Sequence, residues 1–193
     1  MASPERLNLD ARGLTVCPVL GGEERLRLLN YQNNKISCMS NLHGLPSLIF
    51  LDLYNNNIQQ ITSLEPVPSL RVLMLGKNRI QQISRLEVLS RLDVLDLHSN
   101  QIRSVEGLSH LSELRVLNIS GNQLHALDGL QGLRSLTELN ARRNQITHVA
   151  PLDEVKNLLR IFLSQNAVDS LDRLRPLLRL PQLVELALDG NPV

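Results

Sequence analysis

The sequence contains no tryptophan, and its only aromatic side chains belong to two phenylalanines and two tyrosines. Hydrophobic residues nevertheless make up 42% of its 193 residues. A core drawn from this composition must consist almost wholly of aliphatic side chains, chiefly leucine. A bias this strong is typical of a repeated unit.

Concentrated charge is also missing, because 20 basic residues face 19 acidic ones and the formal net charge is +1. The backbone of a nucleic acid or an anionic membrane surface attracts proteins with clustered positive charge, so this balance favours neither as a partner. No apolar run approaches the roughly 20 residues that span a bilayer. The first nine residues include Glu5 and Arg6 and lack the apolar segment of a secretory signal. We therefore expect a protein of the cytosol or nucleus.

Cysteine is scarce as well, with Cys17 and Cys38 alone in the chain. Two cysteines are too few for a disulfide scaffold, and in a reducing compartment both are expected to be thiols. Cys17 falls in an apolar column of the sequence and Cys38 adjoins the next member of that column. We expect both to be buried or half-buried and to behave as small hydrophobic side chains.

What the sequence does contain is an asparagine every 22 residues, with a last spacing of 25. The eight asparagines are Asn34, Asn56, Asn78, Asn100, Asn122, Asn144, Asn166 and Asn191. Aliphatic residues fill the positions eight, five and three before each asparagine and two after it, with few exceptions. One step of 22 before Asn34 falls on Arg12, so the first unit is degenerate.

Each part of this unit predicts a local structure. The Leu-x-Leu pair alternates with a period of two, which indicates a short strand whose leucines point inward. The asparagine follows the strand, where its amide can pair with backbone groups that a turn leaves free. Stacked units then give an α/β solenoid of leucine-rich repeats, a curved stack with a parallel β-sheet on its concave face and short turns or 3₁₀ segments on its convex face. The 25-residue spacing adds one triplet to the run Leu174, Leu177, Leu180 and Leu183, and it predicts an extra convex turn there.

The repeats also predict the organisation of the chain. Residues 1–25 form a degenerate amino-terminal repeat or cap, and residues 26–193 form eight repeats. No carboxy-terminal cap follows the last repeat, which would leave the inward faces of Leu186 and Leu188 bare on one side. We expect the 193 residues to be part of a longer protein.

Catalytic, cofactor and metal motifs are not found in this sequence. Gly76 and Lys77 lack the other residues of a phosphate-binding loop. The five histidines do not pair with cysteines at the spacing of metal ligands. Asp96 and His98 lie two apart on one predicted strand and are the best catalytic pair, but no nucleophile or oxyanion donor accompanies them. We therefore expect no catalytic residues, metal site or cofactor, with an enzyme using Asp96 and His98 as a minor alternative.

The remaining candidates are the side chains that point outward from the concave sheet. Three of the four aromatic residues fall there, whereas Tyr31 alone serves the core. A mixture of aromatic anchors and charged groups is typical of protein-binding surfaces. The predicted partner-binding residues are Phe50, Asp52, Tyr54, Val72, Met74, Asp96, His98, Arg142 and Phe162.

Two parts of this surface have simpler explanations that stay open. Val72, Val94 and Val116 are residues that β-propensity alone would place on strands. Lys77, Arg142, Arg143 and Arg160 suggest a smaller basic region that could dock an acidic segment, but a solvated ridge is the favoured interpretation.

The 22-residue unit resembles the class of leucine-rich repeat typified by the nuclear regulatory subunit of protein phosphatase 1. Several stretches are also similar to the leucine-rich repeat subunits of the neuronal tubulin polyglutamylase complex: residues 51–58 (LDLYNNNI), 72–80 (VLMLGKNRI), 94–102 (VLDLHSNQI), 136–147 (LTELNARRNQIT) and the closing DGNP of residues 189–192. Tyr31, Ala141 and the Gly21-Gly22 break depart from the idealised repeat.

This resemblance implies a non-catalytic scaffold within a microtubule-modifying complex. The glutamate-ligating activity there belongs to a separate tubulin tyrosine ligase-like subunit, which is an expected partner. A cytoplasmic location, at the cytoskeleton, centrosome or cilium, would follow. The class also includes phosphatase regulators and ciliary or axonemal assembly adaptors, so a regulatory subunit of protein phosphatase 1 is the alternative.

Overall fold

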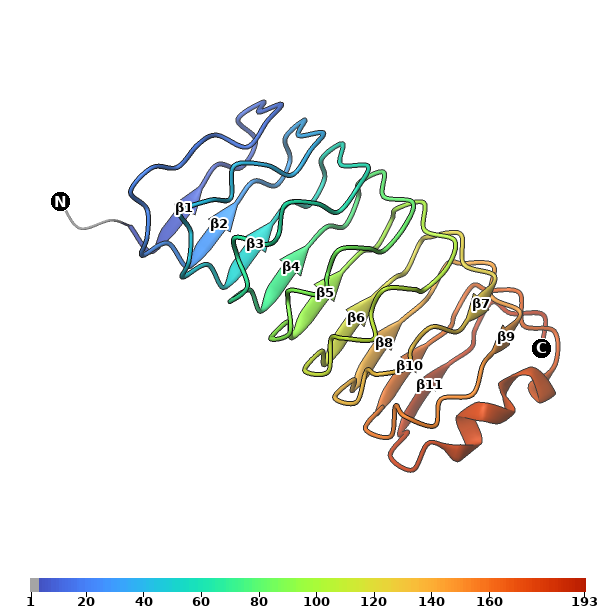
Figure 1. The fold of residues 1–193 in the computed structure, drawn as a ribbon. Helices are drawn as coiled ribbons and strands as arrows, with labels where there is room; N and C mark the ends of the chain where they lie inside the picture. The colour runs from blue at the N-terminus through green and yellow to red at the C-terminus, as the bar shows by residue number, and fades with distance from the viewer. Residues whose placement is uncertain (1–3) are drawn as a thin grey trace.

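The computed structural model describes residues 4–193 as a stack of coils with one strand in each coil (Figure 1). Nine strands form a single parallel sheet in the order β1-β2-β3-β4-β5-β6-β8-β10-β11. Their bounds are β1 Arg6–Asn8, β2 Leu28–Asn30, β3 Phe50–Asp52, β4 Val72–Met74, β5 Val94–Asp96, β6 Val116–Asn118, β8 Glu138–Asn140, β10 Arg160–Phe162 and β11 Glu185–Ala187. The sheet runs the length of the stack, and the two ends of the chain lie at opposite ends of it (Figure 1).

The pairing of the strands follows directly from the repeat. Each strand is joined to the next at equivalent positions, so that Leu51 lies beside Leu73 and Leu73 beside Leu95. Along β2 to β6 the middle residue is buried and its two neighbours are half-buried. The alternation expected for a sheet with one covered face is therefore present, and it sorts side chains into a core set and a displayed set.

The core is a continuous column of aliphatic side chains. Leucines such as Leu51, Leu73 and Leu97 have no exposed surface. Tyr31 is also fully buried, and its hydroxyl is the one fully covered side-chain polar atom without a hydrogen-bond partner among the described residues. Burial raises the pKa of Tyr31 well above its ordinary range. The predicted solenoid with a leucine core is confirmed.

The side opposite the long sheet is mostly turns, with two further elements. The predicted extra turn is the 3₁₀ helix η1, Leu171–Arg179, which begins after Ser170, whose hydroxyl accepts a hydrogen bond from the backbone N–H of Asp172. The sequence did not predict the second element, a two-stranded parallel sheet of β7 (Ala126–Leu127) and β9 (His148–Val149). η1 packs beside β9 near the end of the stack (Figure 1).

The repeated asparagines join neighbouring coils. The amide nitrogen of Asn56 donates to the carbonyl oxygens of Tyr31 and Leu53, and its amide oxygen accepts from the backbone N–H of Ile36. The same three-way pattern recurs from Asn78 to Asn191. Asn34 also bonds both coils, and its oxygen accepts from Arg12 and Leu14. Each asparagine therefore satisfies backbone groups that the turn would otherwise leave unpaired.

The ends of the stack differ from its middle. Residues of the degenerate first unit supply β1 and partly buried leucines, and Cys17 is fully buried. Leu186 is 39% exposed at the other end, and Leu188 is half-buried.

The prediction for Cys38 is wrong, because its side chain is exposed beside the buried Met39. None of the helices among the described residues has the length and apolar character to cross a membrane.

Candidate partner-binding site

The displayed side of the long sheet, here called the sheet face, consists of three parallel rows of side chains. One row lies six residues before each asparagine, one four before and one two before. The strand pairing places Phe50, Val72, Val94 and Val116 in the first row. Asn30, Asp52, Met74, Asp96 and Asn118 follow one another in the second row. The third row includes Tyr54, Gly76, His98, Ser120 and Arg142.

All nine predicted partner-binding residues lie on this face and are half-buried. Their partial burial follows from the parallel strands, because neighbouring strands are only about 4.8 Å apart and their side chains shield one another. Side-chain contacts join five of them into two groups rather than one field. One group surrounds Tyr54 and His98, and the other consists of Arg142 and Phe162.

The first group is held together by rings and a carboxylate. The rings of Tyr54 and His98 have centroids 5.6 Å apart, and the ammonium of Lys77 lies 5.3 Å from the Tyr54 ring centre. The imidazole Nδ1 of His98 is 2.6 Å from a carboxylate oxygen of Asp96, which also accepts from the backbone N–H of His98. Gly76 separates Tyr54 from His98 in the row and has no side chain to keep the two rings apart. The result is an aromatic surface with a cation on one side and a carboxylate on the other.

Asp52 lies beside this group and has little compensation for its charge. Its carboxylate accepts one hydrogen bond, from the backbone N–H of Tyr54 at 2.9 Å. Burial raises the pKa of Asp52, the Tyr54 N–H lowers it, and the nearby carboxylates of Asp10 and Asp96 raise it again. Desolvation and like charge therefore act together on this carboxylate.

The second group begins two coils beyond His98. The guanidinium carbon of Arg142 is 4.1 Å from the centre of the Phe162 ring, a cation–π distance. Arg142 and Arg143 also border a shallow polar hollow with Ser120, Ser164, Gln165 and Asp189. Several of the basic side chains toward this end already have partners. Arg160 forms an ion pair with Glu138 at 2.7 Å, Arg143 donates to Gln165, and Lys77 lies in the first group.

Sequence reasoning missed a structural role of the second row. Its asparagine or aspartate accepts a hydrogen bond from the backbone N–H two residues later in most coils, as in Asn30 to Gln32, Asp52 to Tyr54 and Asn118 to Ser120. The signal was available, because short Asx side chains are typical of such local bonds. Asp52 and Asp96 therefore have a local reason to be there, apart from any partner.

No arrangement among residues 4–193 points to metal or nucleophilic chemistry. Groups of three or more histidine, cysteine, aspartate or glutamate side chains that could hold a metal ion are not found in this part of the chain. Asp96 and His98 are in contact, and the ring of Tyr54 lies beside that of His98. Among the described residues, no contact places a nucleophilic side chain against this pair.

Comparison with known families agrees with the repeat. Residues 90–146 match the family described as "Leucine rich repeat", and residues 24–66 and 68–110 match "Leucine Rich repeats (2 copies)". The chain belongs to the leucine-rich repeat family. The matched segments span the central sheet from β2 to β8, which contains the first group of the sheet face.

Individual relatives agree on the fold and cover different shares of the chain. "Leucine-rich repeat-containing protein 49" of Mus musculus is 52% identical over 46 residues, which are 24% of this chain and only 7% of that protein. The crystal structure of internalin C2 from Listeria monocytogenes has a TM-score of 0.82 at 29% identity and covers 95% of this chain and 80% of the internalin. The structure of a TLR13–ssRNA13 complex has a TM-score of 0.80 at 26% identity, over 86% of this chain and 26% of TLR13.

Proposed function

We propose that this leucine-rich repeat chain is a non-catalytic scaffold whose sheet face binds a partner protein. One observation carries the proposal. In a chain with four aromatic residues, Phe50, Tyr54 and Phe162 are half-buried on the sheet face, while Tyr31 alone is in the core. Displayed aromatic side chains with bordering charges are the features that contribute most to binding energy at protein interfaces.

We further propose that the scaffold is a subunit of a tubulin polyglutamylase complex. The resemblance of residues 51–58, 72–80, 94–102 and 136–147 to the leucine-rich repeat subunits of that complex supports this assignment. The chain is also 52% identical to leucine-rich repeat-containing protein 49 over 46 residues. In this role a tubulin tyrosine ligase-like subunit carries the ligase chemistry, and the location is cytoskeletal.

Affinity capture with a paired set of variants tests the sheet face. We expect the unaltered chain to capture specific proteins that the F50A/Y54A double variant does not. Leu178→Ala is the matched control, because Leu178 is an apolar side chain that is 86% exposed on η1, away from the sheet face. Identical capture by a folded F50A/Y54A variant would rule out the aromatic anchors.

The captured material also tests the assignment to a complex. We expect it to add glutamate to tubulin, and we expect the purified chain alone to be inactive. Glutamylation by the chain alone would overturn the non-catalytic role. Capture of a phosphatase catalytic subunit, without glutamylating activity, would favour the phosphatase-regulating alternative.

A further inference from the structure

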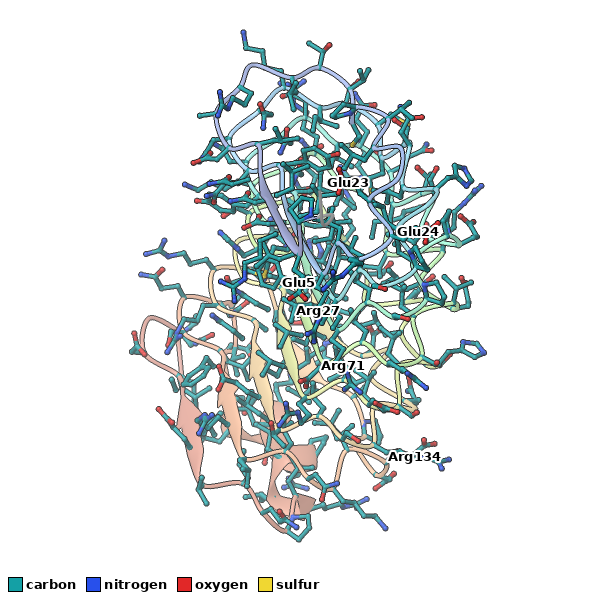
Figure 2. The ribbon with its side chains drawn as sticks, turned by 90° about the vertical axis from the view of Figure 1, so that its left-hand side faces the viewer. Glu5, Glu23, Glu24, Arg27, Arg71 and Arg134 are labelled. Atoms are coloured by element: carbon teal, nitrogen blue, oxygen red, sulfur yellow. The ribbon has the colours of Figure 1, made fainter. Side chains whose placement is uncertain are left out.

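Charged side chains form ion pairs in one region of the solenoid surface and lack them in another. At the start edge of the sheet, where the chain enters the strands, basic and acidic side chains are paired between coils. Arg25 meets Glu5 at 3.5 Å, Arg71 meets Glu113 at 3.8 Å, and Arg115 forms two hydrogen bonds to Asp93. Figure 2 shows Glu5, Arg27 and Arg71 in succession along this edge.

The carboxylates of the sheet face from β1 to β5 have no such partners. Among residues 4–193, no ion pair joins Asp10, Asp52 or Asp96 to a lysine or arginine. Asp96 contacts the His98 imidazole and accepts from the Asn118 amide, and among the described residues Asp52 accepts only the Tyr54 N–H. The sheet face from β1 to β5 therefore carries three carboxylates that no lysine or arginine pairs with.

The turn bond of the second row does not require that charge. Asn30, Asn118 and Asn140 make the same bond to the N–H two residues later that Asp52 and Asp96 make. An asparagine at position 52 or 96 would keep the acceptor oxygen without the charge. The negative charge is thus an added property of the two central coils, where the aromatic and apolar side chains also lie.

The apolar row next to these carboxylates limits the shape of the occupant. Phe50, Val72, Val94 and Val116 follow one another across β3 to β6, at about 4.8 Å per strand. A helix lying along the stack repeats its apolar face about every 5.4 Å, so after three strand spacings its apolar side chains are offset from the row by only about 2 Å. An extended segment repeats the same face about every 6.6 Å, and after three strand spacings its side chains are offset by about 5 Å. A helix therefore matches the row better.

We propose, on the basis of the proposed scaffold function, that the sheet face binds an amphipathic helix of a partner protein whose flanking polar side chains are basic. The apolar side of the helix covers the row from Phe50 to Val116. Its lysines or arginines lie over Asp52 and Asp96, which flank Met74 and stand two strands, about 10 Å, apart. Two turns of helix span nearly the same distance, so basic residues seven apart in sequence meet both carboxylates.

Three synthetic peptides of about 18 residues, long enough to form a helix, probe this surface. The first combines leucine and lysine with a helical period, the second replaces lysine by glutamate, and the third has the first composition with strict alternation. We expect the first to bind the chain at least about tenfold tighter than either of the others. Equal binding of the glutamate peptide would overturn the inference that the occupant is basic. Equal binding of the alternating peptide would overturn the inference that it is helical. Failure of the first peptide to bind overturns the proposal.

Charge-only variants locate the binding. The D52N/D96N double variant keeps both turn acceptors and should weaken the first peptide at least about fivefold. E87Q/E106Q is the control, because it removes the same charge from two exposed residues outside the sheet face and should leave binding unchanged. An equal effect of both double variants would show nonspecific attraction and overturn the proposal. A partner that depends on Phe50 and Tyr54 but not on Asp52 and Asp96 would overturn only this inference and leave the scaffold function standing.

Discussion

The imidazole of His98 occupies the space that a side chain at Gly76 would need. A Cβ at position 76 would clash with both Nδ1 and Cε1 of His98. Gly76 itself does not have a positive φ angle, so the close approach rather than the backbone is what calls for glycine here. This gap lets the His98 ring lean between the coils toward Tyr54 while it contacts Asp96.

Gly76→Ala is therefore expected to displace the His98 ring and to disturb the site more than the fold. The obstacle is a side chain that can rotate, so the free energy of unfolding should change by no more than about 1 kcal/mol. Partner capture should fall, and the His98 ring signals should shift in an NMR spectrum. Unchanged His98 signals in the alanine variant would contradict the placement of the ring. Ser120→Ala, in the same row, is the control that should leave these signals in place.

The facing of the strands predicts unequal costs at two adjacent residues. Leu97 has no exposed surface and packs in the core, whereas His98 is half-buried on the sheet face. Leu97→Ala should lower the free energy of unfolding by about 2 to 5 kcal/mol, the usual range for truncating a buried leucine. His98→Ala should cost little by comparison. Urea unfolding of both variants measures the difference, and equal losses would show that the facing is wrong.

The asparagine ladder predicts a large effect from one side chain. Asn100→Ala would remove donors to the carbonyls of Leu75 and Leu97 and the acceptor for the N–H of Ile80. Buried groups left unpaired cost about 1 to 3 kcal/mol each, so a loss of about 3 kcal/mol or more is expected. Asn140→Ala is the control, because its side chain accepts one bond of 3.3 Å on the sheet face. A small loss at Asn100 in urea unfolding would mean that the ladder is not required.

The solenoid and its core could be predicted from the sequence because each position of the repeat recurs at the same place in every coil. A leucine at a fixed place in every coil can face only one way once the coils stack in register, and the same is true of Asn100. The second sheet of β7 and β9 was missed because a strand of two residues is too short to show an alternation of apolar and polar side chains. Cys38 was placed wrongly because it adjoins a core column without belonging to it, and one step along a strand or turn reverses the facing.

The site was predictable in position and less so in grouping. The facing of Phe50, Tyr54 and Phe162 follows from the repeat, but the contacts between side chains depend on rotamers that the repeat does not specify. The basic side chains toward the carboxy-terminal coils illustrate this limit. Lys77 lies beside Tyr54 and Arg160 pairs with Glu138, so neither adds free charge to the Arg142 end. The binding roles themselves stay predictions.

The unpaired hydroxyl of Tyr31 predicts a substitution that should not destabilise the protein. Tyr31→Phe keeps the ring in the core and removes a polar group that is buried without a hydrogen bond. Removing such a group should leave the free energy of unfolding unchanged or raise it by up to about 1 kcal/mol. Urea unfolding again gives the measurement. A loss greater than about 1 kcal/mol would show that the hydroxyl is bonded in solution.

Asp52 and Asp93 predict opposite pH dependences of stability. The pKa of Asp52 is raised above the ordinary 3.8, mainly by burial, so its ionisation disfavours the folded state. Its favourable contribution is complete below pH 3.8 and is lost as the pH rises through the folded pKa. Asp52→Asn should therefore match the unaltered chain in acid and be more stable than it at pH 7.

The pKa of Asp93 is lowered, first by its hydrogen bond with Arg115, so its contribution to stability is present above pH 3.8 and is lost as the pH falls through the folded pKa. Asp93→Asn should accordingly be less stable than the unaltered chain at pH 7, with the difference closing in acid. Urea unfolding between pH 3 and pH 7 compares each variant with the unaltered chain. A stability difference of the same sign for both variants at pH 7 would contradict the charge environments described for the sheet face and the start edge.

If a basic helix binds over Asp52, it supplies the cation that Arg115 supplies to Asp93. The pKa of Asp52, followed by NMR, should then fall when the lysine peptide is added.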